Sequence, residues 1–348
     1  ISACLVGSEM CIRDSRGAGA VVIGKTVTTE FATYQAGPTR NPRNDAYTPG
    51  GSSSGSAAAV ADDMVPFALG SQTAGSIIRP ASYCGIVGFK PTFGAVPRAG
   101  VKSLAESLDT VGGFARSVPD VALFASVMMR DPRMLDLAYE GKPRVGMCRT
   151  LQWRHAQPET KEAFAQAAAT LSRAGAVVQE VPLPSQDCML VQLHADIMAF
   201  EASQSLAFER LQHASQLSPK IQAVLEAGSQ ITAEEHIKNL ARAEESRARV
   251  NSWFQDFDVV LAPSAAGEAP FADLGTGDPQ FSRAWTLFGL PCLNLPFATG
   301  PQGLPVGLQV VGQRYDDHRT LAVAAWIHER LLAANAPDIG ASDMWPRG

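Results

Sequence analysis

Apolar and polar positions along the chain fall into short strand-like runs that alternate with longer helix-like ones. Short runs of β-branched and other apolar residues predict buried strands, and they cover residues 20–24, 84–89, 144–148, 176–181, 258–264 and 307–314. Helix-favouring stretches cover residues 56–61, 157–175, 232–254 and a segment that starts near 317. Pro158 and Gly175 fit the first turn and the C-terminal cap of one helix. Thr232 and Glu235 predict a capping box at the start of another.

This alternation favours a layered α/β architecture with a largely parallel or mixed sheet. No internal repeat and no long linker divides the chain, so we expect one domain over residues 16–348. Residues 1–15 (ISACLVGSEMCIRDS) precede the first periodic pattern and are similar to translated adapter sequence. We expect a non-native leader there and exclude it from the fold.

The composition is that of a globular protein, with 46% hydrophobic residues, 18% charged residues and a formal net charge of −5 at pH 7. A mildly acidic chain gives no electrostatic reason to expect nucleic acid or an anionic membrane as a partner. No apolar run approaches the roughly twenty residues that span a bilayer, and we expect a cytoplasmic protein. The six cysteines form no C-x-x-C pair, and the histidines form no H-x-x-x-H motif. The sequence therefore predicts reduced thiols, no metal site and no cofactor.

Two formal motif matches stand in the wrong context. GAVVIGKT (residues 19–26) fits the pattern of a phosphate-binding P-loop, but its spacer residues favour a strand where that loop needs glycine-rich freedom. GSSSG (residues 51–55) fits the nucleophile elbow of α/β-hydrolases, but the polar loop before it supplies no buried strand. We expect neither nucleotide binding nor an elbow.

Two loops rich in glycine and serine carry the candidate chemistry. The first, TPGGSSSGSAAAVADD (residues 48–63), runs directly into an alanine-rich helix, unlike a flexible linker. The second, GSQTAGSIIRP (residues 70–80), places small residues before Ser76. Backbone N–H groups can then turn toward one point, as an oxyanion hole requires. Either loop alone is more simply a structural turn.

Together, the two loops resemble the signature of the amidase signature family. GGSSSGSAAAVA and then GSQTAGSIIRPASYCGIVGFKPTFGAVPRAGV match it nearly continuously over residues 50–101, and weaker likeness extends from about residue 16 to residue 314. The resemblance implies a three-layer α/β/α fold with a central mixed, largely parallel twisted sheet. It also implies an enzyme that hydrolyses a linear amide to an acid and ammonia or an amine, without a cofactor.

The resemblance further implies a Ser–Ser–Lys triad. Ser76 aligns with the nucleophile, and Ser52, 24 residues earlier, aligns with a bridging serine that the family holds next to a cis peptide bond. Ser76 would attack the amide carbonyl and form an acyl-enzyme, while Ser52 passes its proton toward a neutral lysine. Ser53 would support this relay by hydrogen bonding, and Ser54 would be structural.

The second loop would also stabilise the developing oxyanion through its backbone N–H groups, which belong to Thr73, Ala74, Gly75 and Ser76. Arg79, three residues past the nucleophile, could pair with a substrate carboxylate through its planar fork. A structural ion pair that holds the loop is the alternative.

The lysine base is expected to be absent from this sequence. In the family it lies several dozen residues upstream of the bridging serine, further than the 51 residues before Ser52. Lys25 and Lys90 match family positions that are structural. The domain would then lack its N-terminal portion, and we expect the chain as printed to be nearly inactive.

Several functions remain open within this resemblance. A general acyl-amide hydrolase acting on a small-molecule amide is the favoured one. The A subunit of an amidotransferase that acts on Glu/Asp-tRNA would need partner subunits and typically carries an acidic residue where this chain has Gln72. A specialised hydrolase of urea derivatives, dicarboxylate monoamides or lactam oligomers, or an inactive relative used for binding, are further alternatives. The amphipathic helix predicted at 193–212 could line the acyl pocket or form the contact of a homodimer.

Overall fold

A single mixed sheet of eight strands runs through the structure, a computed structural model that describes residues 9–181 and 189–335. The strand order is β1-β3-β2-β7-β8-β6-β4-β5. The strands are β1 (Phe67–Gln72), β2 (Val87–Lys90), β3 (Thr110–Ala115), β4 (Arg144–Met147), β5 (Val177–Glu180), β6 (Val259–Pro263), β7 (Cys292–Thr299) and β8 (Pro305–Val311).

Most neighbouring strands in this sheet are antiparallel. Five of the seven pairs are antiparallel. The two parallel pairs are those of β4 with β5 and of β4 with β6. The mixed sheet is therefore confirmed, whereas the expected excess of parallel pairs is not found among the described residues. Short connections explain part of the difference. The link between β7 and β8 has room for a turn but not for the crossover that a parallel pair needs.

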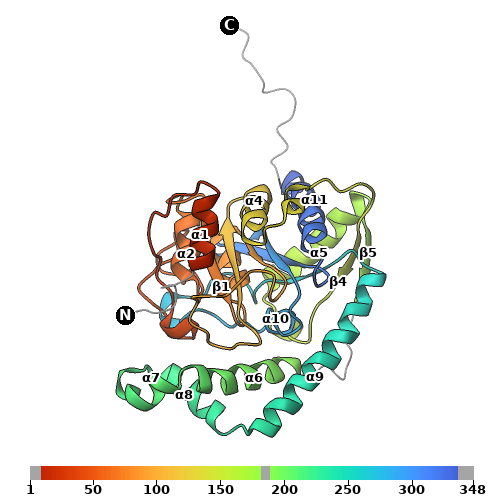
Figure 1. The fold of residues 1–348 in the computed structure, drawn as a ribbon. Coiled ribbons are helices and arrows are strands. Elements are labelled where there is room, and N and C mark those ends of the chain that lie inside the picture. Colours follow the sequence, from red (N-terminus) through yellow and green to blue (C-terminus); the bar gives the residue numbers. More distant parts are fainter. Residues whose placement is uncertain (1–8, 182–188, 336–348) are drawn as a thin grey trace.

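Helices cover both faces of the sheet (Figure 1). On one face, α4 (Val118–Met128), α5 (Pro158–Arg173) and α11 (Asp317–Asn335) pack in one apolar cluster with strand residues. On the other, α3 (Ile78–Cys84), α6 (Leu190–Ser205), α9 (Ala233–Asn251) and α10 (Arg283–Leu287) share a second cluster with the sheet. The three-layer α/β/α architecture is confirmed.

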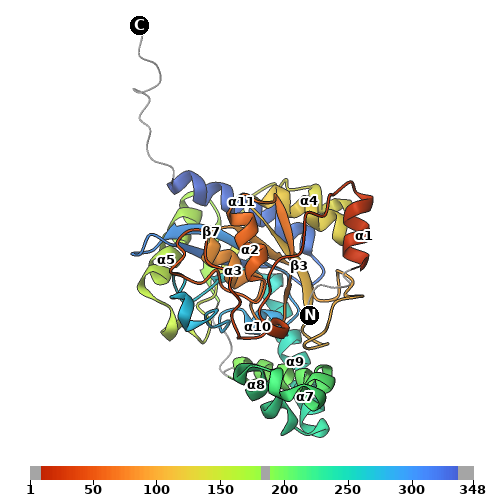
Figure 2. The ribbon, with the colours of Figure 1, turned by 90° about the vertical axis from the view of Figure 1, so that its left-hand side faces the viewer.

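A group of helices flanks this body on one side (Figures 1 and 2). It consists of α6, α7 (Ala207–Gln212), α8 (Pro219–Ser229) and α9. Ala202 of α6 and Leu206, which follows its last turn, pack with Ile221 and Leu225 of α8 in an apolar cluster that also includes Leu104 of the main body. Across the described residues, no helix combines the length and apolar character needed to cross a membrane.

Several predicted elements are found, and one is not. The helix with Gly175 beyond its end is α5, and the capping box of Thr232 and Glu235 opens α9. The strand predicted at 20–24 is wrong. That segment pairs with no strand, and Val21 and Ile23 are 80% and 76% exposed. An apolar run becomes a strand only where a neighbour can satisfy its backbone groups.

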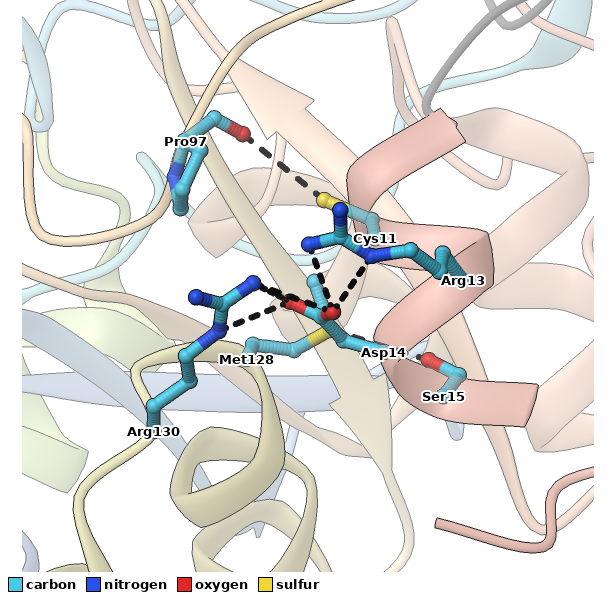
Figure 3. Close-up of polar contacts among 7 residues, drawn as sticks. All are labelled: Cys11, Arg13, Asp14, Ser15, Pro97, Met128 and Arg130. Carbon is cyan, nitrogen blue, oxygen red and sulfur yellow. Dashed lines mark hydrogen bonds and ion pairs between the residues drawn. The ribbon is translucent and has the colours of Figure 1, made fainter. Parts of the chain in front are cut away.

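The start of the described chain forms a helix that packs against the body. Helix α1 (Glu9–Gly17) includes part of the segment that we excluded from the fold on its sequence. Cys11 is buried against Met128, and Asp14 accepts hydrogen bonds from Arg130, with an N–O distance of 2.8 Å for the shortest (Figure 3). Burial, together with the charge of Asp14, raises the pKa of the Cys11 thiol to about 11, so the thiol is protonated at neutral pH.

Candidate active site

The first serine-rich loop turns sharply into a helix. The Gly51–Ser52 peptide bond is cis, as the resemblance implies. Ser53 stands at the N-terminal cap of helix α2 (Ser54–Ala61), and Ser52, Ser53 and Ser54 are all buried. A buried serine run at the start of a packed helix is not a linker.

The second loop connects the end of β1 to the start of α3, and Gln72 fixes its shape. The Gln72 Oε1 atom accepts hydrogen bonds from the backbone N–H groups of Ile77 and Ile78, at 2.9 and 3.0 Å. Its Nε2 atom donates to Thr286 Oγ1 at 2.9 Å. Ser76 lies in the turn between Gln72 and the two isoleucines to which it hydrogen-bonds, and Ser76 is only 6% exposed.

Three contacts join the two loops. The Ser53 hydroxyl donates to the carbonyl of Ser71 and accepts from its N–H, both at 3.2 Å. Arg79 donates from Nη2 to the carbonyl oxygen of Gly51 at 2.7 Å, which ties α3 to the cis peptide. Helices α2 and α3 also pack together, with Ala57 and Ala81 in one apolar cluster. The loops that carry Ser52 and Ser76 are therefore held side by side.

The carbonyl groups of the second loop are engaged, and its N–H groups are not. The carbonyl of Thr73 lies 2.8 Å from His194 Nε2, and the carbonyl of Ala74 accepts from Thr286 Oγ1 at 2.8 Å. In a trans peptide the C=O and N–H bonds point in opposite directions, so the N–H groups of Ala74 and Gly75 point away from these two partners. Within the described chain, the N–H groups of residues 73–76 donate to no other group. They are available to a ligand.

His194 on α6 is a neutral imidazole in this site. It is fully buried, and its pKa is lowered to about 3 by burial and by the nearby charge of Arg283. Neutral His194 donates from Nε2 to the carbonyl of Thr73, and its Nδ1 accepts from Arg283 Nη1 at 3.3 Å. This pattern fixes the tautomer and couples α10 to the loop before Ser76.

Asp109 holds the opposite side of the same loop. Its carboxylate accepts from the Thr73 hydroxyl at 2.5 Å and from the backbone N–H groups of Leu104 and Ala105 at 2.8 and 3.1 Å. Burial raises the pKa of Asp109, while these hydrogen bonds act in the opposite direction. Thr73 is thus fixed through both its hydroxyl and its carbonyl.

A small cavity opens at Ser76. Its wall includes Tyr34, Thr73, Arg79, Met198 and Pro279. Met198 comes from α6, so the helix predicted at 193–212 contributes to this wall. The hydroxyls of Ser52 and Ser76 make no hydrogen bond to another group in the described part of the chain.

Arg79 lies in this wall and is buried. Besides Gly51, it reaches Thr276 Oγ1 at 3.4 Å, while its Nε and Nη1 atoms have no hydrogen-bond partner. Burial lowers the pKa of its guanidinium. Among the described residues no carboxylate forms an ion pair with Arg79, so it holds the loop through a carbonyl rather than through the ion pair of our alternative.

The two lysines singled out from the sequence lie elsewhere. Lys90 is fully buried in β2, where Nζ donates to the carbonyl of Pro91 at 2.9 Å and burial lowers the pKa of its ammonium group. Lys25 lines a different cavity, beside β1. Among the described residues, no lysine lines the cavity at Ser76.

Comparison with known proteins points to one family. The profile of the family described as Amidase matches residues 10–321. The A subunit of the Glutamyl-tRNA(Gln) amidotransferase of Agathobacter rectalis is 31% identical, over 88% of this chain and 71% of the relative. The corresponding protein from Synechococcus sp. (strain CC9311) is 34% identical, over 88% and 73% of the two chains.

Comparison with solved structures points to the same family. The crystal structure of an amidase has a TM-score of 0.85 and 30% identity, covering 92% of this chain and 77% of the other. The peptide amidase from Stenotrophomonas maltophilia has a TM-score of 0.77 and 29% identity, with 92% and 76% covered. The resemblance found in the two serine loops therefore extends over most of the fold.

Proposed function

This chain belongs to the amidase family, and from that premise we propose that it hydrolyses the amide of a carboxylic acid. Ser76 Oγ attacks the carbonyl carbon, and its proton passes through Ser52 toward a base. The C–N bond then breaks, the same relay protonates the leaving ammonia or amine, and an ester to Ser76 remains. Water attacks that ester and releases the acid. The substrate is a small-molecule amide, and no cofactor takes part.

The observation that carries this proposal is the set of unused N–H groups beside Ser76. The loop carbonyls of Thr73 and Ala74 are fixed by His194 and Thr286, so the adjoining N–H groups are held in place before a substrate arrives. Such preorganised donors stabilise an oxyanion, and removing one typically costs about 3–4 kcal/mol of transition-state stabilisation. We assign the oxyanion hole to residues 73–76.

Ser52 is the proposed proton relay, and Ser53 is its support. The hydroxyl of Ser53 is occupied by the backbone of Ser71, which leaves Ser52 as the serine of this loop with a hydroxyl free to exchange a proton. Arg79 keeps the Gly51–Ser52 peptide in place by hydrogen bonding to Gly51. Contact of Arg79 with a substrate carboxylate remains a second proposed role.

We place the base on a lysine outside residues 1–348. In support, no lysine among the described residues lines the cavity at Ser76. The chain as printed should hydrolyse amides at least about 10²–10⁴-fold more slowly than a form that contains the positioned base. Equal ammonia release by both forms would show that a lysine within these 348 residues suffices.

A second candidate function is that of the tRNA-dependent amidotransferases. It is favoured by the names of the curated relatives, which are 31% and 34% identical in the two examples above. Gln72 argues against it, because its side-chain amide donates a hydrogen bond that orients Thr286. An ionised acidic residue at this position could not donate this hydrogen bond. A hydrolase releases ammonia from a simple amide without partners, whereas an amidotransferase depends on its other subunits and on tRNA.

The test is covalent labelling of a form that contains the positioned base with a fluorophosphonate probe, followed by peptide mass analysis. We expect one adduct, on Ser76. Ser76→Ala should abolish it, and the control Ser54→Ala should retain it, because Ser54 is the first residue of α2 and has no proposed role in acylation. An adduct on another serine, or none on that folded form at high probe concentration, would refute the assignment of Ser76 and favour an inactive relative.

A further inference from the structure

A second pocket opens beside the cavity at Ser76. It has a volume of about 480 Å³, and its wall includes Lys220 and Arg283. The two cavities share Tyr34 and Pro279, so they adjoin each other. A substrate with its amide at Ser76 would therefore have this pocket next to it.

Arg283 presents an unneutralised charge to this pocket. Its Nη2 donates to the Tyr34 hydroxyl at 2.8 Å, and its Nη1 faces His194 Nδ1 at 3.3 Å. Its Nε atom is buried and has no hydrogen-bond partner. Throughout the part of the chain that the structure describes, no carboxylate forms an ion pair with Arg283. All the partners of this guanidinium are neutral.

Lys220 adds a second positive charge at the rim. Its Nζ donates to the backbone carbonyl of Tyr34 at 3.3 Å, and it also forms no ion pair with a described residue. Tyr34 thus stands between two cations. With Arg79 in the adjoining cavity, three basic side chains line the two cavities.

The acidic residues of the pocket are engaged with the backbone. Asp278 accepts from the N–H of Gln280 at 2.9 Å, and Glu268 accepts from the N–H of Leu304 at 2.7 Å. Both carboxylates lie in the pocket wall, but neither forms an ion pair with Lys220 or Arg283, so both basic groups can pair with an anionic ligand.

We propose that this pocket binds a carboxylate of the substrate, so that the preferred substrates are amides that carry a carboxylate a few bonds from the scissile carbonyl. Arg283 supplies the planar fork that suits a carboxylate, and Lys220 adds a point charge at the opening. The proposal deepens the proposed function and rests on it for the position of the amide at Ser76.

The experiment compares two ligands of nearly equal size, succinamate and succinamide, which differ in that one carboxylate of the first is an amide in the second. Binding to the full chain is measured by calorimetry, which needs no turnover. We expect succinamate to bind about 10- to 100-fold more tightly, the effect typical of hydrogen bonds to a charged group. Arg283→Gln should reduce this preference to about threefold or less, and Arg283→Lys should retain part of it.

Arg247→Gln is the matched control. Arg247 is also a partly buried arginine next to α10, where it donates to the carbonyl of Leu287, but it does not line either cavity. Its loss should leave the preference unchanged. If Arg283→Gln does not fold, the comparison of the two ligands on the unmodified chain still decides: equal affinities overturn the proposal.

Failure of this inference is distinguishable from failure of the proposed function. Fluorophosphonate labelling of Ser76 together with equal affinities for the two ligands would reject the carboxylate pocket and leave the acylation site intact. A preference for succinamate that depends on Arg283, with no labelling of Ser76, would support the pocket and reject the acylation.

Discussion

His194 should make the folded protein lose stability as the pH falls from 7 to 5. The imidazole is fully buried between the carbonyl of Thr73, which favours its protonated form, and the guanidinium of Arg283, which opposes it. Its pKa is lowered to about 3, chiefly by burial and secondly by the charge of Arg283. In the unfolded chain the same histidine has a pKa of about 6.5.

The size of the effect follows from these two values. Between about pH 6.5 and pH 3 the unfolded chain binds a proton at His194 and the folded chain does not, so the free energy of unfolding decreases as the pH falls through this window. pH 5 lies about 1.5 units below the pKa of His194 in the unfolded chain. Proton binding by the unfolded chain therefore lowers the free energy of unfolding by about 2 kcal/mol at this pH. The effect at pH 7 is close to zero.

Urea unfolding at pH 7 and pH 5 tests this for the unmodified chain and for His194→Gln, whose amide can still donate to Thr73. Other groups, such as His328 with a pKa also lowered by burial, contribute to both proteins and cancel in the comparison. The unmodified chain should lose about 2 kcal/mol more than the variant between the two pH values. The same loss in both proteins would mean that His194 is protonated normally in the folded state, and the fixed tautomer would have to be abandoned.

Two further predictions concern the scaffold of the site. Gly50→Ala should destabilise the protein much more than Gly94→Ala. Both glycines have φ of +82°, which costs any other residue about 1–2 kcal/mol, but an added Cβ at Gly50 would lie 2.8 Å from Pro80 Cα, whereas at Gly94 it meets nothing within 4 Å. Equal losses in thermal unfolding would refute the close packing of the two loops. Asp109→Ala should cost at least about 3 kcal/mol, because it leaves the buried N–H groups of Leu104 and Ala105 without an acceptor. Asp109→Asn should cost less in the same urea assay, and the opposite order would contradict the proposed role of the carboxylate as an acceptor.

The sequence predicts those elements whose signals are local. The capping box that opens α9 and the proline and glycine that bracket α5 depend on residues a few positions apart, and both helices are present. The run at 20–24 fails as a strand because a strand also depends on a neighbour, and no nearby residue reveals whether one exists. Whether two strands pair in parallel or antiparallel is equally hard to predict from local residues, since it depends on the path of the chain between the strands.

The same distinction applies to the candidate site. The loops of Ser52 and Ser76 are recognisable because glycine and serine follow one another in a short stretch, and the expected cis bond before Ser52 is present. His194, Asp109 and Thr286 give no such signal. Each is an isolated polar residue, up to 214 positions from its partner in the second loop. A sequence search could have selected them only as buried polar positions within apolar helices or at strand ends.

These distant residues are nevertheless the ones that direct the loop. A loop of small residues such as Thr73-Ala74-Gly75 has little conformational preference of its own, so its sequence permits an oxyanion hole without specifying one. Hydrogen bonds from α6 and α10 to two successive carbonyls fix the peptide planes and thereby the direction of the N–H groups. Because Arg283 contacts both His194 and the second pocket, the group that binds the substrate carboxylate would also support the donors that receive the oxyanion. Substrate selection and activation would then depend on the same side chain, and Arg283→Gln should impair binding and acylation together.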